Sequence, residues 1–159
     1  MVYAQTLFEL QKFEEAISQY RFLLEQDYVQ DEKTELWYLL GLTLLQLSNY
    51  GESEVALLKA QESNPQLDGL DYYIGICQMS REDYRAAVDS FTAAIEAGSM
   101  IQHSHFSRGV CSLMLEENVD GAQEDLRFAS EYAGEDSDPN VKLQADDLLA
   151  QLQGVIYAP

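Results

Sequence analysis

The chain has 159 residues, and 47% of them are hydrophobic, a proportion typical of a folded domain rather than of a disordered chain. It carries 28 acidic and 9 basic residues, for a formal net charge of −19. Because this charge repels nucleic-acid backbones and anionic membrane surfaces, neither is expected as a partner.

The hydrophobic segments and the cysteines indicate the cellular location to expect for the protein. The sequence has neither an apolar run of membrane-spanning length, about 18 residues, nor the basic start and apolar core of a signal peptide. We therefore expect no membrane insertion and a cytoplasmic location by default. Cys77 and Cys111 lie in apolar stretches and are too few for a disulfide framework, so we expect buried free thiols.

Four consecutive units share one pattern of large and small residues. In each unit a small residue is followed nine or ten positions later by an aromatic or apolar residue. These pairs are Ala4 and Phe13, Gly41 and Tyr50, Gly75 and Tyr84, and Gly109 and Val119. The second members lie 37, 34 and 35 positions apart, close to the period of about 34 that is typical of helix-turn-helix repeats.

The first unit, about residues 1–30, has a short first helix. Its apolar residues Val2, Tyr3, Leu7 and Phe8 would therefore lack cover. Either the chain is a piece of a longer array, or another molecule covers this end. Self-association through this short repeat is one form of the second alternative.

The second unit, about residues 34–67, shows the pattern most fully. It contains Trp37, Leu40, Gly41, Tyr50, Leu57, Ala60 and Pro65. This set resembles the tetratricopeptide repeat, with Ser53 where alanine is usual. Pro65 ends the unit because proline cannot continue a helix.

The third and fourth units, about residues 68–101 and 102–136, repeat the pattern. The third does so through Gly75, Tyr84, Ala87, Phe91 and Ala94. The fourth does so through Arg108, Gly109, Ala122, Leu126 and Ala129. Four units in phase carry the resemblance over roughly residues 1–134.

A final helix is expected at about residues 139–153. Pro139 suits its first position, with Asp138 as the N-cap. Apolar residues recur on one face as Val141, Ala145, Leu148, Leu149 and Leu152. We interpret this helix as a cap for the array, with a partner-binding helix as the alternative.

The expected fold is a single all-α domain, residues 1–159. It is a right-handed superhelical solenoid of about four hairpins plus the capping helix.

The resemblance implies a binding face, because in this family the first helix of each hairpin lines a concave groove. The corresponding residues are Tyr38, Leu42, Leu45, Tyr72, Ile76, Met79, Phe106, Val110 and Leu113. This face lacks the Lys, Arg and Asn with which some members hold a chaperone's C-terminal carboxylate, so that activity is disfavoured. An apolar stripe suits an amphipathic helix or an apolar segment, and the acidity favours basic flanks. The alternative is that these side chains mostly pack on one another and on neighbouring helices.

Chemistry and cofactors are not expected. His103 and His105 have no further ligands at metal-binding spacing. The chain shows no nucleophile with an adjacent base, no phosphate loop and no paired-carboxylate signature.

The leading hypothesis is a non-catalytic scaffold or adaptor that binds a protein or peptide. The class II chaperones of type III secretion are similar in length, acidity and repeat count, but usually have an extra N-terminal helix not found here. An accessory domain of an enzyme is the third alternative.

Overall fold

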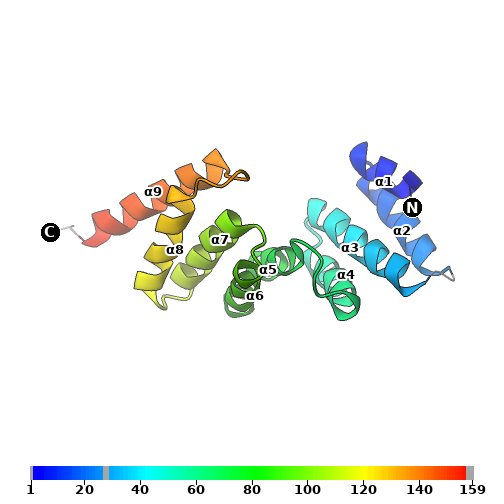
Figure 1. The fold of residues 1–159 in the computed structure, drawn as a ribbon, viewed down its shortest axis with the longest axis horizontal. Coiled ribbons are helices and arrows are strands. Elements are labelled where there is room, and N and C mark those ends of the chain that lie inside the picture. The colour runs from blue at the N-terminus through cyan, green and yellow to red at the C-terminus, as the bar shows by residue number, and fades with distance from the viewer. Residues whose placement is uncertain (1, 27–28, 157–159) are drawn as a thin grey trace. The chain divides into compact units, whose positions relative to one another are not determined.

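Nine α-helices make up the secondary structure of residues 2–26 and 29–156, the part that the computed structural model describes, and this part has no strand (Figure 1). The helices are α1 (Val2–Glu9), α2 (Phe13–Leu24), α3 (Gln30–Gln46), α4 (Tyr50–Ser63), α5 (Leu70–Ser80), α6 (Tyr84–Glu96), α7 (Ile101–Met114), α8 (Val119–Glu131) and α9 (Pro139–Ile156). Consecutive helices pack on one another from α1 to α5 and from α6 to α9, so the predicted all-α repeat fold is confirmed. Residues 1, 27–28 and 157–159, which the predicted span includes, lie outside the described part.

The repeat pattern locates the second helices to the residue. Phe13, Tyr50, Tyr84 and Val119, the large residues that mark the four units, are the first residues of α2, α4, α6 and α8. The preceding turns contain non-glycine residues with positive φ: Gln11, Ser48, Glu82, Glu116 and Asn118. A left-handed residue cannot extend a right-handed helix, so these positions separate the two helices of each hairpin.

The helices form two compact units, residues 1–82 and 83–159. Unit 1 contains α1 to α5, and unit 2 contains α6 to α9. The division falls in the turn between α5 and α6, inside the third predicted repeat. The expectation of one domain with four repeats therefore stays a prediction.

Unit 1 is held by two apolar clusters. The first joins α1 to α4 through Ala4, Leu7, Ala16, Ile17, Tyr20, Leu36, Leu40, Leu44 and Ala56. The second joins α4 to α5 through Leu57, Ala60, Leu70, Ile74 and Cys77. At Gly41 the two helices of a hairpin approach so closely that a Cβ atom would lie 2.7 Å from the side chain of Leu57. Gly41 is therefore a packing residue rather than a hinge.

A buried chain of hydrogen bonds connects three helices of unit 1. The Sγ of Cys77 donates to the Oγ of Ser53 at 3.3 Å, and that hydroxyl donates to the carbonyl of Gly41 at 2.8 Å. Burial raises the pKa of the Cys77 thiol, which keeps it protonated and able to donate. The serine that replaces the usual alanine thus has a hydrogen-bonding role.

Unit 2 ends with α9 packed on α8. The buried residues Val141 and Ala145 of α9 cluster with Leu126 and Ala129 of α8. Leu148, Leu149 and Leu152 pack against this cluster, as the predicted apolar stripe requires. The backbone N–H of Asn140 donates to Asp138 Oδ1 at 2.8 Å, which confirms Asp138 as the residue that caps the start of α9.

Candidate functional site

The predicted binding residues of unit 1 lie on α3 and α5, which contact each other. They are Tyr38, Leu42, Leu45, Tyr72, Ile76 and Met79, and all six are partly buried. Together they define the α3–α5 face. None of them is fully buried in the core and none is fully exposed.

Three tyrosines form the aromatic part of the α3–α5 face. The rings of Tyr38 and Tyr73 meet edge to face with centroids 6.4 Å apart, and those of Tyr73 and Tyr72 do so at 5.4 Å. The hydroxyl of Tyr38 donates to the carbonyl of Asp68 at 2.8 Å. Sequence analysis assigned Tyr38 and Tyr72 to the binding face, but it missed Tyr73, whose ring contacts both.

Burial determines the ionisation of these phenols. It raises the pKa of Tyr38 to about 12, with nearby Tyr73 and Asp68 adding to the shift. It also raises the pKa of Tyr72 to about 12. Both phenols are therefore neutral at physiological pH and can act as hydrogen-bond donors and apolar contacts.

The predicted residues of unit 2 are more engaged in the core. Phe106, Val110 and Leu113 lie on α7 and are partly buried. Phe106 and Leu113 pack against the cluster that α8 and α9 form. In unit 1, Tyr38 and Leu45 pack similarly against the α4–α5 cluster. The alternative that these side chains pack on neighbouring helices thus applies to part of the set, most strongly in unit 2.

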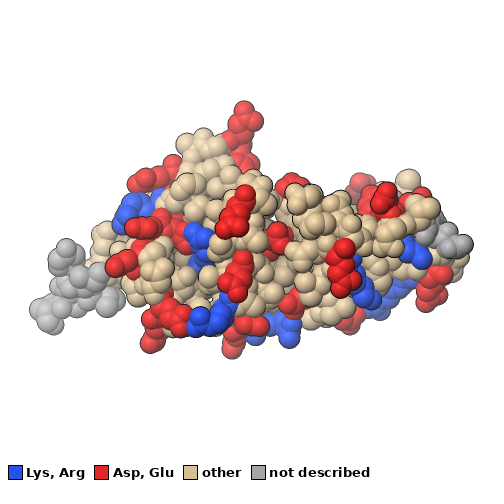
Figure 2. All heavy atoms as spheres, turned by 60° about the horizontal axis from the view of Figure 1, so that its bottom comes forward, with Lys and Arg blue, Asp and Glu red and all other residues tan. Residues whose placement is uncertain are grey.

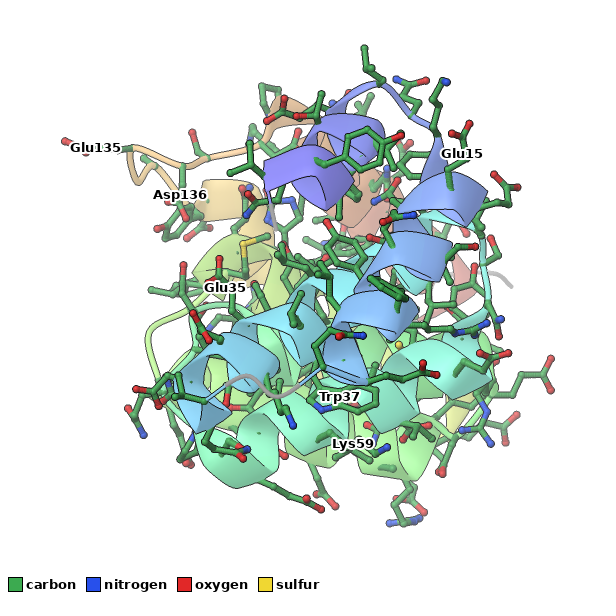
Figure 3. The ribbon with its side chains drawn as sticks, turned by 90° about the vertical axis from the view of Figure 1, so that its right-hand side faces the viewer. Glu15, Glu35, Trp37, Lys59, Glu135 and Asp136 are labelled. Carbon is green, nitrogen blue, oxygen red and sulfur yellow. The ribbon has the colours of Figure 1, made fainter. Side chains whose placement is uncertain are left out.

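A groove that sequence reasoning did not anticipate lies between α2 and α4, above α3. Three adjoining pockets of about 250, 340 and 380 Å³ share Arg21, and we call them together the α2–α4 groove. Arg21 of α2 pairs with Glu52 of α4 across it. The ammonium of Lys59 lies 4.0 Å from the centroid of the Trp37 ring, and Figure 3 shows these two side chains together. In the sequence analysis, Trp37 served only as a marker of the repeat.

Unit 2 contains a polar cluster that the sequence analysis also did not predict. The carboxylate of Asp125, 7% exposed, accepts hydrogen bonds from Arg108 Nε at 2.8 Å and from Arg108 Nη2 at 2.7 Å. His105 Nδ1 lies 2.7 Å from the same carboxylate, and its ring stacks on Phe128. Arg108 also reaches the hydroxyl of Thr92 at 3.1 Å. These contacts connect α6, α7 and α8.

The electrostatics of this cluster favour a charged carboxylate. Burial alone would raise the pKa of Asp125, but the hydrogen bonds and charges of Arg108 and His105 outweigh burial and lower it. The hydrogen bond to Asp125 is the main reason why the pKa of Arg108 is raised. The ion pair of Arg108 with Asp125 therefore connects α7 to α8.

The histidines singled out in the sequence have carboxylate neighbours. His103 Nε2 lies 3.5 Å from Asp138 Oδ2, and His105 contacts Asp125. Within residues 2–26 and 29–156, no group of three or more His, Cys, Asp or Glu side chains is arranged to hold a metal ion. In the same ranges no helix has the length and apolar character needed to cross a membrane.

Comparison with known proteins bears on the first two hairpins. Residues 4–68 match the sequence model of the tetratricopeptide repeat family, so the resemblance is confirmed for this part of the chain. The matched segment contains α2, α3 and α4 and hence the whole α2–α4 groove. Repeats of this family generally mediate protein–protein interactions and are typically not catalytic. No curated protein matches the chain.

Proposed function

We propose that this chain is a non-catalytic scaffold or adaptor, and that its α3–α5 face binds an apolar or amphipathic segment of a partner protein. The observation that carries the proposal is the Tyr38–Tyr73–Tyr72 series on two neighbouring helices. Aromatic side chains that are held in place by their neighbours, yet only partly covered, are typical anchors of protein interfaces. Ile76 extends the apolar part of the face along α5.

The charge of the chain bears on which partners reach this face. Residues 1–82 contain 14 acidic and 5 basic residues, a net charge of −9. On the face shown in Figure 2, carboxylates are scattered among uncharged surface and a smaller number of basic side chains. Such a field speeds the encounter with basic partners, while the affinity comes from desolvated apolar contacts. We expect the bound segment to have an apolar stripe with basic flanks.

A binding experiment with two variants tests the proposal. A peptide selected from a random library on the immobilised chain is titrated against wild type and the double variant Tyr72→Ala/Ile76→Ala by calorimetry. Loss of a central aromatic anchor should cost about 2 kcal/mol or more, roughly a 30-fold loss of affinity. Leu58→Ala, at an exposed apolar position of α4, is the matched control and should bind as wild type does. All variants are first compared by thermal unfolding, so that a folding defect is recognised.

The salt dependence of binding distinguishes a site on the apolar α3–α5 face from a site on the acidic surface. Raising the ionic strength should slow association, because exposed charges are screened, but should leave binding in place. Binding that salt abolishes and that Tyr72→Ala/Ile76→Ala leaves intact would mean that the acidic surface is the site.

A chaperone for apolar clients is the second candidate, favoured by the same apolar face and by the acidity of the chain. It requires the bound segment to lack stable structure of its own. Hydrogen exchange on a captured partner tests this directly, since a folded partner would show protected amides and favour the scaffold.

A further inference from the structure

The α2–α4 groove is a second apolar surface of unit 1, and it uses other residues than the α3–α5 face does. Its floor comes from α3, where Leu40 and Leu44 are buried and Trp37 is partly buried. One wall is α4, where Val55 lines the groove and is 54% exposed. Apolar side chains at the base of a groove and an exposed valine at its edge form a surface that an apolar ligand can cover.

The length of the groove sets the size of its occupant. Its lining runs along α2 from Glu14 through Arg21 to Glu25, the residue that directly follows the helix. At a rise of 1.5 Å per residue, this wall is about 16 Å long, or about three helical turns. A helix of that length inserts side chains at positions i, i+3 or i+4, and i+7 into such a groove.

The charges around the groove determine which residues the bound helix should carry at its two ends. Carboxylates line both ends of the α2 wall, Glu14 at one and Glu25 at the other. At the centre the Arg21 guanidinium pairs with Glu52, and the Lys59 ammonium lies over Trp37. The charge that remains at the two ends is therefore negative, in a unit whose net charge is also negative.

We propose that the α2–α4 groove docks a three-turn amphipathic helix of a partner protein, with aliphatic anchors facing α3 and a Lys or Arg residue near each end. The anchors displace water from Trp37 and Val55, in the space above the buried Leu40 and Leu44. The basic ends pair with Glu14 and Glu25, which fixes the register of the helix and rejects acidic competitors. This surface goes beyond the function proposed above and does not depend on it.

Trp37 provides the measurement, because it is the single tryptophan of the chain and lines the groove. The probe is a blocked synthetic peptide of about four helical turns, free of tryptophan, with leucines on one face and lysines at both ends. A companion peptide has glutamates in place of the lysines. The lysine peptide should shift the emission of Trp37 to shorter wavelengths as it covers the ring. The glutamate peptide should bind at least about tenfold more weakly.

A matched pair of variants locates the binding. Val55 and Leu58 are both exposed apolar residues of α4, and of the two only Val55 lines the central pocket of the groove. Val55→Arg should weaken the lysine peptide about tenfold, since it fills the groove, whereas Leu58→Arg adds the same charge and should change affinity less than about twofold. Tyr72→Ala/Ile76→Ala should leave this binding unchanged, so failure here is distinguishable from failure of the α3–α5 face.

Four results would overturn the proposal. The first is tighter binding of the glutamate peptide, and the second is an equal effect of Val55→Arg and Leu58→Arg. The third is an unchanged emission of Trp37 at about 1 mM of the lysine peptide, which would leave no useful affinity. The fourth is a dimer in sedimentation that Val55→Arg dissociates, because the occupant would then be a second copy of the chain.

Discussion

Gly41 allows α3 and α4 to approach, and a side chain at this position should separate them. A Cβ added there would lie 2.7 Å from both Cγ and Cδ2 of Leu57 and 3.4 Å from its backbone nitrogen. Leu57 is fully buried, so it has no open space into which to turn. Overpacking typically costs about 1–3 kcal/mol, while replacing a helical glycine by alanine gains about 1 kcal/mol. We expect Gly41→Ala to lower the free energy of unfolding by about 0–2 kcal/mol, and Gly41→Leu to lower it by about 3 kcal/mol.

The assay is a urea titration followed by the fluorescence of Trp37, which lies on the same helix. Gly51→Ala is the control, because no atom lies within 4 Å of its added Cβ, and it should not destabilise the chain. Gly41→Leu should also cost less when Leu57 is already alanine, since the clash is then relieved. An unchanged urea midpoint for Gly41→Leu would refute the reasoning, as would a gain for Gly41→Ala equal to that for Gly51→Ala.

Three further predictions concern unit 2 and the thiols. Ending the chain before Pro139 should expose the apolar face of α8, lower the melting temperature and cause aggregation in sedimentation; an equally stable monomer would exclude a capping role. Asp125→Asn should lower the free energy of unfolding by about 3 kcal/mol, because Arg108 keeps a partly buried charge without its ionic partner. Since the folded-state pKa of Asp125 is depressed, its contribution is present above the unfolded pKa of about 3.9 and is lost as pH falls through the folded pKa. Denaturation at several pH values should therefore show the difference between wild type and Asp125→Asn shrinking in that acid range, and a constant difference would count against the ion pair. Burial raises the pKa of Cys111 to about 12 and also raises that of Cys77, so a thiol-specific reagent should modify neither until the chain unfolds; rapid labelling of the native protein would contradict this.

The sequence predicted the helix boundaries well where a large residue follows a turn. Phe13, Tyr50, Tyr84 and Val119 each begin a helix, because each follows a turn that interrupts the apolar periodicity of the preceding helix. The positive φ angles of those turns could not be predicted, since the residues that adopt them are not glycines. Local preference is overridden there by the packing of the helices on both sides.

The candidate sites were predicted less completely. The period of the repeat identifies which residues share a face, so Tyr38 and Tyr72 were expected, but it says nothing of a neighbour such as Tyr73 that turns between them. The α2–α4 groove depends on the gap that two second helices leave above α3, which no spacing along the chain reveals. The pairing of Arg108 with Asp125 joins different helices, and in the sequence Asp125 is one of many acidic residues in an acidic segment.

The hydrogen bonds from Cys77 through Ser53 to the carbonyl of Gly41 make the second hairpin specific for the helix that follows it. Repeat arrays are often treated as strings of interchangeable modules, each defined by its own consensus. Here a consensus alanine at position 53 would remove the acceptor of a fully buried thiol, and a grafted α5 without Cys77 would leave the hydroxyl of Ser53 with one partner fewer. Exchanging single hairpins would therefore break a matched pair, and an engineer who recombines this chain should transfer α3, α4 and α5 as one block.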